Sequence, residues 1–467
     1  MNKNKIAIIT LGDSRREFFK NRVHIAEAEL KNIIGVLEKD YELYIPDVVF
    51  NIDEGQVVAD EIKAKGINCV IIHLPIWATP NLAFRIAYST ELPVMLLGNK
   101  RPDSSSIVTL LAIAGMLEQS GKECIRLVGD VKNIDVYKKV KNFITACNLV
   151  NSISRSSFGM IGGRSIGIGT TVADPSQWQK IFNTEFDHCD QYEVVYRAKE
   201  IDEKRVELHL NWIKENIGKI EYGDFFTEKT LELQVRSYLA LKDMVAENNY
   251  DFLGLKCQQE LSDHFVLQCI SVAMLNNNYD AEGSKEVIPT SCECDCDGAM
   301  TMKLLSLCSG NQPTNLVDIK FFDDEKKEFV LANCGSIAPY FADPNDANKA
   351  MSKVSLLPHV FGKAGGSSLQ MIAEEGIVTI ARLFRKDGKY VLACFEGELE
   401  MRPIEELRKT TWCYPHEFVK ADIDYEKFFQ TINSNHLHTV YGSYSEVLKL
   451  FCQMKGIEFI SYNKGNV

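Results

Sequence analysis

Long apolar runs and clusters of basic residues are both missing from this 467-residue sequence. No stretch reaches the ~18 consecutive apolar residues that a membrane-spanning helix needs, so we expect no membrane span. Acidic residues outnumber basic ones by 64 to 52, which gives a net charge of -12. This balance argues against nucleic acid and against an anionic membrane surface as partners.

An export signal and a disulfide framework are missing as well. The first apolar run, IAIITL, is short and is soon followed by Arg15 and Arg16, which is not the pattern of a signal peptide. The 14 cysteines are mostly single residues scattered from Cys69 to Cys452. Scattered thiols without an export signal are typical of a reducing compartment, so we expect a cytoplasmic protein.

The length and the order of patterns along the chain predict three domains. Residues 1–153 alternate short apolar segments with amphipathic ones, which favours an α/β domain whose parallel sheet is covered on both faces. Ligands of such sheets bind beyond the carboxyl ends of the strands. The segments expected at those ends are GDSRR (12–16), PIW (75–77) and GNKR (98–101).

The remaining two domains are expected over residues 154–315 and 316–467. The first is a second α/β domain, and its glycine-rich segment 159–169 lacks the spacing of a dinucleotide-binding loop. A strand end that is approached closely by other atoms is the favoured interpretation of that segment. The last domain is expected to be mostly antiparallel β with a final helix, and Asp387-Gly388 predicts a hairpin.

The segment SCECDCDGAM (291–300) interleaves three cysteines with acidic residues before an expected helix. If residues 291–296 are extended, Glu293 and Asp295 share one face of the strand and the cysteines share the other. Carboxylates at a helix entry favour Mg²⁺ or Mn²⁺, whereas thiolates favour Zn²⁺. The cysteines are too close along a strand to chelate one ion well, and no second cysteine pair completes a structural zinc site. A solvated acidic turn is the third interpretation.

Two distant segments carry residues of the same ligand types. Asp318 lies among apolar residues on an expected strand, where an acid needs either solvent or a partner. His436 and His438 lie in SNHLHTVYG near the C-terminus. A single His is more often structural than a ligand, but Glu293, Asp318 and a His from separate segments would make an O,O,N metal site with positions left for a substrate.

Five motifs occur along the chain in the order GGRSIGIGTTVADPSQWQKIF, SCECDCDGAMTMKLLSL, LVDIKFFD, GIVTIARL and SNHLHTVYG. Together they resemble the L-fucose isomerase family, which is related in architecture to L-arabinose isomerase. The likeness extends over most of the chain, although this chain is shorter than the well-known bacterial members and looks more like their compact relatives. It implies an aldose–ketose isomerase whose two α/β domains are followed by a barrel-like C-terminal domain.

The resemblance also implies a set of site residues. Family members bind Mn²⁺ through a Glu, an Asp and a His, which correspond here to Glu293, Asp318 and His436. The Glu and the Asp also move protons between C1 and C2 through a cis-enediol, so Glu293 and Asp318 are the expected catalytic residues. We therefore expect Mn²⁺, or another divalent ion such as Mg²⁺ or Co²⁺. Asp295 would support a ligand from behind or replace one.

Four residues are expected to contact the sugar: Arg16, Trp77, Trp412 and Asn435. Arg16 and Trp77 correspond to family residues of the first domain that reach the active site of a neighbouring subunit, which implies a homo-oligomer, a hexamer in the family. A solvated helix start is the alternative interpretation of Arg16. Asn435 lies beside the ligand His, while Trp412 would stack on a sugar or, in the preferred interpretation, lie in the core.

The expected substrate is a free pentose or deoxyhexose. Two other functions fit the same patterns. The tandem α/β domains suggest a non-catalytic sugar-binding protein, and the enediolate chemistry also suits a metal-dependent epimerase or aldolase.

Overall fold

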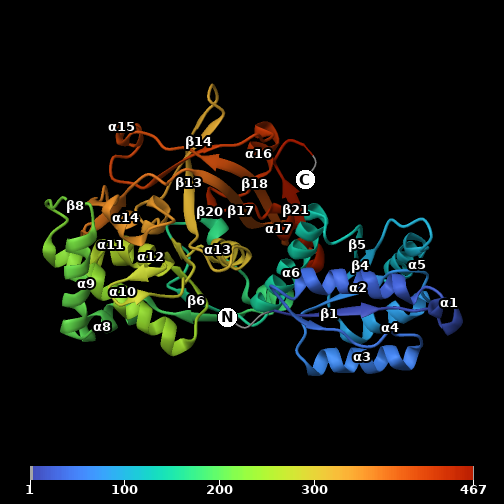
Figure 1. Cartoon of the computed structure of the whole chain (residues 1–467). Helices are drawn as coiled ribbons and strands as arrows, with labels where there is room; N and C mark the ends of the chain where they lie inside the picture. Colours follow the sequence, from blue (N-terminus) through green and yellow to red (C-terminus); the bar gives the residue numbers. More distant parts are fainter. Residues whose placement is uncertain (1–3, 466–467) are drawn as a thin grey trace. The chain divides into compact units, whose positions relative to one another are not determined.

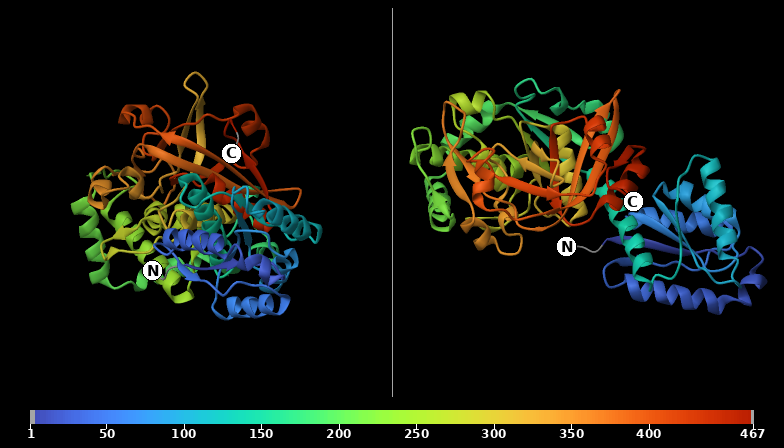
Figure 2. Two further views of the ribbon diagram at one scale, coloured as in Figure 1. Left: turned by 45° about the vertical axis from the view of Figure 1, so that its right-hand side comes forward. Right: turned by 90° about the horizontal axis from the view of Figure 1, so that it is seen from above.

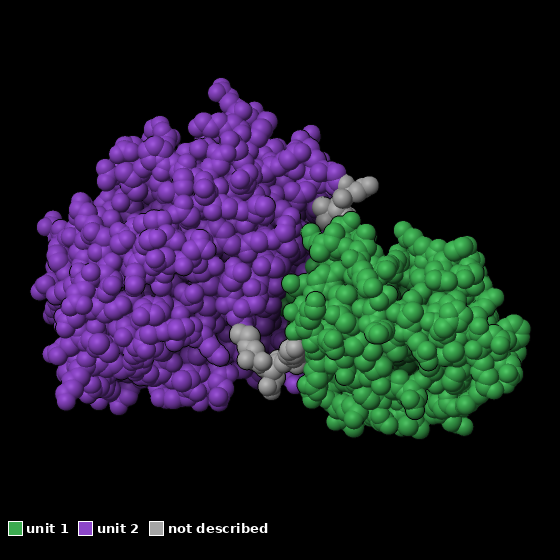
Figure 3. Space-filling view, in the orientation of Figure 1, with its two compact units in different colours: residues 1–151 green, residues 152–467 purple. Residues whose placement is uncertain are grey.

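The computed structural model describes residues 4–465. The chain divides into two compact units, residues 1–151 and residues 152–467 (Figure 3). The division into three domains at 153/154 and 315/316 stays a prediction. Within the described residues, none of the helices is both long and apolar enough to span a bilayer.

A five-stranded parallel sheet forms the centre of the first unit. Its strand order is β2-β1-β3-β4-β5. The strands are β1 (Lys5–Thr10), β2 (Glu42–Tyr44), β3 (Cys69–Leu74), β4 (Val94–Gly98) and β5 (Ile125–Val128). All six residues of β3 are buried, which is why this central strand reads as an almost continuous apolar run. The parallel α/β class predicted for this part of the chain is confirmed.

Helices cover both faces of this sheet. They are α1 (Arg16–Lys20), α2 (Val23–Leu37), α3 (Ile52–Ala64), α4 (Pro80–Thr90), α5 (Ser106–Gln119) and α6 (Ile134–Ile153). Figure 1 shows α2 and α3 on opposite sides of β1. Asn51 caps α3, because its side chain accepts a hydrogen bond from the backbone of Glu54. Right-handed crossovers between parallel strands produce this two-faced arrangement.

The second unit contains a four-stranded parallel sheet with the order β12-β9-β6-β7. Its strands are β6 (Ser157–Ile161), β7 (Glu185–Cys189), β9 (Phe252–Leu255) and β12 (Thr290–Cys292). A Cβ atom added at Gly159 would lie 2.7 Å from the side chain of Leu253. This close approach agrees with the strand-end interpretation of the glycine-rich segment.

Helices and short strands accompany this sheet. The helices are α7 (Pro175–Phe182), α8 (Gln191–Glu200), α9 (Glu203–Asn216), α10 (Glu228–Asn248), α11 (Glu260–His264), α12 (Cys269–Asn276), α13 (Cys296–Cys308) and α14 (Ala347–Ser352). The short strands are β8 (Lys219–Ile220), β10 (Tyr279–Asp280), β11 (Gly283–Ser284), β15 (Ser355–Pro358) and β16 (Ser367–Gln370). Of these, α13 carries the acidic segment at its start.

A mostly antiparallel sheet completes the second unit. Its strands are β13 (Asn315–Asp323), β14 (Glu328–Ala332), β17 (Gly376–Lys386), β18 (Lys389–Leu399), β19 (His416–Lys420), β20 (His436–Tyr441) and β21 (Glu458–Ser461), and its helices are α15 (Ile404–Arg408), α16 (Tyr425–Thr431) and α17 (Ser445–Lys455). The order is β17-β20-β13-β14-β19-β18, and β18 pairs again with β17, so the sheet closes on itself. The expected antiparallel, barrel-like region is therefore confirmed.

Two hairpins of this sheet follow simple turn chemistry. Asp387 and Gly388 join β17 to β18 with φ angles of 50° and 75°, which is the two-residue turn that the sequence predicts. The turn between β13 and β14 stands clear of the unit in Figure 1 and in the left view of Figure 2. Its charged residues, from 323 to 327, suit a solvated position.

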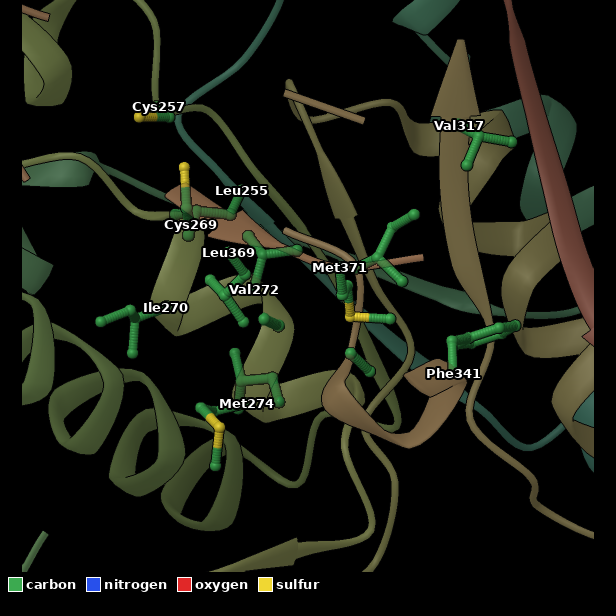
Figure 4. Close-up of a cluster of buried hydrophobic side chains, with 14 of the residues drawn as sticks. Leu255, Cys257, Cys269, Ile270, Val272, Met274, Val317, Phe341, Leu369 and Met371 are labelled. Carbon is green, nitrogen blue, oxygen red and sulfur yellow. The ribbon is translucent and has the colours of Figure 1, made fainter. Parts of the chain in front are cut away.

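One hydrophobic core joins the parallel sheet of the second unit to the closed antiparallel sheet. Leu255 from β9, Val317 from β13 and Leu369 from β16 belong to the same cluster (Figure 4). Such a continuous core holds the loops of both sheets in fixed positions. The candidate site lies where β12, β13 and β20 come together.

Candidate functional site

The acidic segment bends sharply at Glu293. Strand β12 ends at Cys292 and helix α13 begins at Cys296. Between them, Glu293 and Cys294 both have left-handed backbone conformations, with φ angles of 58° and 50°. The segment is therefore extended only as far as Cys292, and the condition under which Glu293 and Asp295 would share one face of a strand is not met. Two consecutive non-glycine residues in this region are strained, and such strain gathers at binding and catalytic sites.

The start of α13 holds this bend in place. Asp295 is the N-cap, and its Oδ1 accepts a hydrogen bond of 2.8 Å from the backbone N–H of Gly298. A Cβ atom at Gly298 would lie 2.7 Å from the Asp295 carboxylate and 2.7 Å from His438 Nε2. Glycine at this position lets α13 approach β20 closely, which brings Glu293 toward the neighbouring strand.

The closed sheet places Asp318 and His436 beside each other. They are paired residues on the antiparallel strands β13 and β20. His436 Nε2 lies 3.2 Å from Glu293 Oε2 and 3.8 Å from Asp318 Oδ1. The structure thus places Glu293 and Asp318, two acids that are far apart in the sequence, each beside the same nitrogen of His436, although the three ligand atoms do not all lie within 4.8 Å of one another.

A buried ion pair stands behind the imidazole. His436 Nδ1 lies 2.7 Å from Asp295 Oδ2, and Arg382 binds both oxygens of the same carboxylate. The side chains of Asp295, Arg382 and His436 are all buried. Burial disfavours the charged form of Asp295, but Arg382 and His436 outweigh it and hold the pKa of this carboxyl well below its usual range. Asp295 therefore fixes the orientation of the His436 ring.

The electrostatics of His436 show a site rich in negative charge. Burial alone would lower its pKa, but the carboxylates of Asp295 and Glu293 raise it to about 10. Burial raises the pKa of Asp318, although 37% of its side chain is open to solvent and contacts with His436 and Asn435 oppose the shift. Acids gathered around one histidine are stabilised by a cation.

Two of the facing atoms have no hydrogen-bond partner. Glu293 Oε2 and His436 Nε2 are both buried without one, even though they lie only 3.2 Å apart. Buried polar atoms are normally satisfied, so this pair points to a missing ligand. Ligands about 2.1 Å from one divalent ion lie roughly 3 Å apart at right angles, which suits this separation. The types of donor, and the separation of this one pair, are compatible with a divalent cation.

His438 belongs to the support of the site. Its Nδ1 lies 3.3 Å from the backbone oxygen of Ala381, and its ring lies against Gly298. Burial and the charge of Arg382 hold the pKa of His438 well below its usual range, which keeps the ring neutral.

Sequence reasoning missed the charged residues behind the site. Arg382 lies in the apolar strand β17, where a charged residue is itself a signal of a buried partner. Asp297 is buried in the first turn of α13 and accepts hydrogen bonds from Trp178 Nε1 and Tyr390 OH at 3.2 Å and 2.9 Å. Burial raises the pKa of Asp297 to about 6, while Arg385 opposes that shift.

The cysteines around Glu293 form a thiol cluster without an ion-binding arrangement. Cys292 Sγ lies 3.6 Å from Cys334 Sγ, and a small cavity beside this pair is also lined by Cys257 and Cys269. Burial raises the pKa of Cys257 and of Cys269, which keeps both thiols protonated. All 14 cysteines, which lie within residues 4–465, are free thiols.

The four predicted sugar contacts lie in different places. Arg16 and Trp77 belong to the first unit, where Arg16 pairs with Glu54 at 2.6 Å. Asn435 Nδ2 donates to Asp318 Oδ1 at 2.9 Å, so it helps to orient that carboxylate. Trp412 is 42% exposed, so its preferred interpretation as a core residue is wrong. Whether these four side chains bind sugar stays a prediction.

A second cluster of ligand-type residues lies elsewhere in the second unit, and sequence reasoning missed it. His209, Asp280 and Glu282 bring three potential ligand atoms within 4.8 Å of one another, the only such set among residues 4–465. Lys242 Nζ lies 2.5 Å from Asp280 and 2.6 Å from Glu282. Arg205 Nε lies 2.6 Å from Glu282. These cations already neutralise the acids, which makes the set a salt-bridge network.

Comparison with known families decides how the first cluster is interpreted. The family model described as the first N-terminal domain of L-fucose isomerase matches residues 3–154. The model described as the C-terminal domain of L-fucose isomerase matches residues 331–463, so the two together cover more than half of the chain. The chain belongs to the L-fucose isomerase family. It is a sugar isomerase of the aldose–ketose type.

Individual relatives in this family are distant. A sulfoquinovose isomerase from Alkalicoccus urumqiensis is 21% identical over 66% of this chain and 67% of its own length. An L-fucose isomerase from Haemophilus influenzae is 23% identical over 53% of this chain and 48% of its own length. An L-fucose isomerase from Bacteroides fragilis is 21% identical over 62% of this chain and 55% of its own length. The chain therefore spans about half the length of the L-fucose isomerases that it matches.

Proposed function

We propose that this L-fucose isomerase family member interconverts a free pentose or deoxyhexose aldose and its ketose at a divalent metal site made by Glu293, Asp318 and His436. The observation that carries the proposal is the buried pair of unpartnered atoms, Glu293 Oε2 and His436 Nε2, with Asp318 Oδ1 within 3.8 Å of the same nitrogen. Mn²⁺ is the proposed ion, with Mg²⁺ and Co²⁺ as close substitutes, because two carboxylates and one imidazole suit such cations.

The proposed reaction moves a proton between C1 and C2 of the sugar through a cis-enediol. A bound divalent ion would polarise the carbonyl and stabilise the negative charge of the enediolate. Glu293 and Asp318 are the two carboxylates within reach of such a site. One would accept the proton from the first carbon, and the other would transfer a proton to or from the adjacent oxygen or carbon. Asn435 would keep Asp318 oriented through its 2.9 Å hydrogen bond.

The buried support of His436 has a distinct task in this proposal. Asp295 Oδ2 accepts a hydrogen bond from Nδ1 of His436, which leaves Nε2 of the same ring facing Glu293 and Asp318. A ligand histidine oriented by a carboxylate is a better electron donor and holds a fixed ring position. Arg382 keeps Asp295 ionised in the protein interior, so the orientation does not depend on solvent.

Deuterium incorporation tests the proposal directly. The metal-loaded protein is incubated in D₂O with L-fucose, L-arabinose, sulfoquinovose and other aldoses, and NMR follows both ketose formation and deuterium at C1 or C2. We expect exchange with at least one sugar, and none after the metal is removed. Bound metal without exchange on any sugar would instead indicate a sugar-binding protein, and inversion at a carbon other than C2 or cleavage of a C–C bond would indicate an epimerase or an aldolase.

We also propose that Arg16 and Trp77 contact the sugar bound to a neighbouring subunit, which makes the active enzyme a homo-oligomer. The support is the match of the first N-terminal domain to the family model. Mixing an Arg16→Ala variant with a Glu293→Gln variant tests this, because subunits that share sites would recover part of the activity. No recovery in mixed oligomers would remove the shared-site proposal.

A further inference from the structure

A large cavity in the first unit has no part in the site described above. Its volume is about 670 Å³, which lies in the range of small-molecule sites. It lies against α2 and the loops that follow β4 and β5, so it opens beyond the carboxyl ends of parallel strands. That is where doubly wound sheets bind their ligands. Neither Arg16 nor Trp77 is among the residues that line it.

The polar feature of this cavity is the carboxylate of Glu29. Its Oε2 accepts a hydrogen bond of 3.0 Å from Asn99 Nδ2 and lies 3.4 Å from His73 Nε2. His73 is 1% exposed and Asn99 is 8% exposed, so both are fixed in the protein interior. Thr10 Oγ1 lies 3.0 Å from His73 Nδ1 and completes the support.

This carboxylate is held in place without a cation. Within residues 4–465, no lysine or arginine forms an ion pair with Glu29, and its Oε1 atom makes no hydrogen bond there. A fixed acceptor of this kind in a cavity is suited to donors on a ligand, and hydroxyl groups of a polyol are such donors.

Two basic residues, Lys100 and Arg101, line the cavity together with one exposed acid, Asp130. Lys100 is exposed, and no acid within the described part of the chain forms an ion pair with it. Arg101 also lines the cavity, with its guanidinium 3.0 Å from Asp103. Apolar side chains, including Ile25, Leu97 and Val131, line the space between. The cavity thus offers an acceptor inside, an apolar wall, and donors for an anion at its mouth.

We propose that this cavity binds a phosphorylated polyol, that is, a sugar phosphate, either free or as part of a nucleoside monophosphate. The sugar hydroxyls donate hydrogen bonds to Glu29, and the phosphate accepts hydrogen bonds from Lys100 and Arg101. The C–H groups of the sugar contact the apolar wall. This site is separate from the proposed metal site, whose three ligands all belong to the second unit, and neither Arg16 nor Trp77 lines the cavity.

Calorimetric titration of the full-length, metal-loaded protein tests the proposal. The probes are ribose 5-phosphate, AMP, adenosine and inorganic phosphate. We expect ribose 5-phosphate or AMP to bind at least about tenfold more tightly than adenosine and phosphate, because each of the latter lacks one of the two recognised groups. Tighter binding of AMP than of ribose 5-phosphate would assign the cavity to a nucleotide, and the reverse order would assign it to a free sugar phosphate.

Substitutions locate the binding. Glu29→Gln should weaken ribose 5-phosphate or AMP roughly 10- to 100-fold, the usual effect of losing a hydrogen bond to a charged group. Glu27→Gln, on the exposed side of the same helix, is the matched control and should change nothing. Lys100→Gln should weaken both phosphorylated probes but not adenosine. Because Lys100 is exposed, this variant keeps the test valid even if Glu29→Gln fails to fold.

Three outcomes would overturn the proposal. The first is no binding of either phosphorylated probe at millimolar concentration, and the second is binding of inorganic phosphate as tight as that of ribose 5-phosphate. The third is an affinity of the Glu29→Gln and Lys100→Gln variants for the phosphorylated probes that equals the affinity of the parent protein. Binding that is lost in Glu293→Gln would also overturn it, because the probe would then occupy the isomerase site. Retained binding in Glu293→Gln supports the separate cavity.

Discussion

Two clusters in the second unit contain the same kinds of side chain but differ in what neutralises them. Glu293, Asp318 and His436 converge without a lysine or arginine in contact with either of the two acids in the described part of the chain. In the cluster of His209, Asp280 and Glu282, two cations lie within 2.7 Å of the acids. The tighter cluster is therefore neutralised by a lysine and an arginine, whereas the acids of the wider one contact no basic group among the described residues except the imidazole of His436.

The difference also appears in the pKa values. Burial alone would raise the pKa of Asp280, but contacts with His209, Lys242 and Tyr238 outweigh it and hold the pKa well below its usual range. In the first cluster, burial raises the pKa of Asp318, and the opposing contacts with His436 and Asn435 do not cancel that shift. Proximity of ligand-type residues is thus a poor guide to a metal site. The better guide is an acid that the protein itself leaves uncompensated.

The largest expected effect is on catalysis by the uncompensated cluster. Glu293→Gln keeps the size of the side chain but removes a proposed metal ligand and proton carrier. We expect the rate of aldose–ketose conversion to fall by about 10³- to 10⁴-fold. Initial rates at saturating sugar and metal measure this change, with the thermal unfolding midpoint as the check on folding.

Glu286→Gln, an exposed glutamate shortly before β12, is the matched control for this prediction. It should leave the rate within about twofold of the parent protein. A Glu293→Gln variant that folds and retains more than a tenth of the parent rate would contradict the assignment of Glu293.

The next effect concerns stability and compares the two clusters through their arginines. Arg382→Gln leaves the fully buried carboxylate of Asp295 without its arginine and with only His436 as a partner, so we expect the free energy of unfolding to fall by about 3–5 kcal/mol. Arg205→Gln removes a partly exposed arginine and should cost only about 1 kcal/mol. Urea unfolding of the full chain, followed by fluorescence and circular dichroism, measures both. Equal losses would show that Asp295–Arg382 is no more than an ordinary ion pair.

The sequence was sufficient for much of the architecture, because buried parallel strands and antiparallel hairpins carry distinct patterns. The almost continuous apolar run of β3 and the turn at Asp387-Gly388 are examples. The strand-to-helix junction expected around residues 291–296 is present, but the alternation of cysteines and acids does not continue as a strand beyond Cys292. There the cap at Asp295 and the close contact at Gly298 override the local pattern, because tertiary packing determines the backbone.

The candidate site was only partly predictable, for a related reason. Glu293, Asp318 and His436 were named through motifs that resemble a family, and the structure places each of the two acids within 3.8 Å of His436 Nε2. Asp295 was named as a possible support, but its partner Arg382 was missed, because the two are 87 positions apart and no local pattern links them. The prediction that Trp412 lies in the core was wrong for another reason. The sequence around an aromatic residue beside a turn does not indicate whether its side chain faces solvent.

Glu417 is a third kind of buried acid, because it contacts neither a basic side chain within residues 4–465 nor a proposed ion. Its effect on stability should therefore depend on pH. Glu417 is fully buried, with its Oε2 2.8 Å from Thr439 Oγ1 and its Oε1 bound by Asn315. Burial raises its pKa from 4.5 to about 7, although both hydrogen bonds oppose the shift. The folded protein therefore holds this proton more tightly than the unfolded chain does.

The sign of the pH effect follows from that preference. The stabilising contribution of protonated Glu417 is fully present below pH 4.5 and is lost as the pH rises to about 7. Glu417→Gln cannot ionise, so its stability relative to the parent protein should increase by about 3 kcal/mol between pH 4.5 and pH 7.5. Urea unfolding at several pH values measures the difference. A difference that does not change with pH would mean that Glu417 stays ionised with a partner.

The smallest expected effect comes from the compensated cluster, and it decides between the two clusters most directly. Glu282→Gln removes an acid that Lys242 and Arg205 already neutralise and whose side chain is 35% exposed. We expect a loss of about 1 kcal/mol or less in the free energy of unfolding and a rate within about twofold of the parent protein. Titration with Mn²⁺, followed by electron paramagnetic resonance, should give the same affinity for Glu282→Gln as for the parent and a much weaker one for Glu293→Gln. The reverse order would place the ion among His209, Asp280 and Glu282, where it would have to displace two protein cations, and the argument from uncompensated charge would fail.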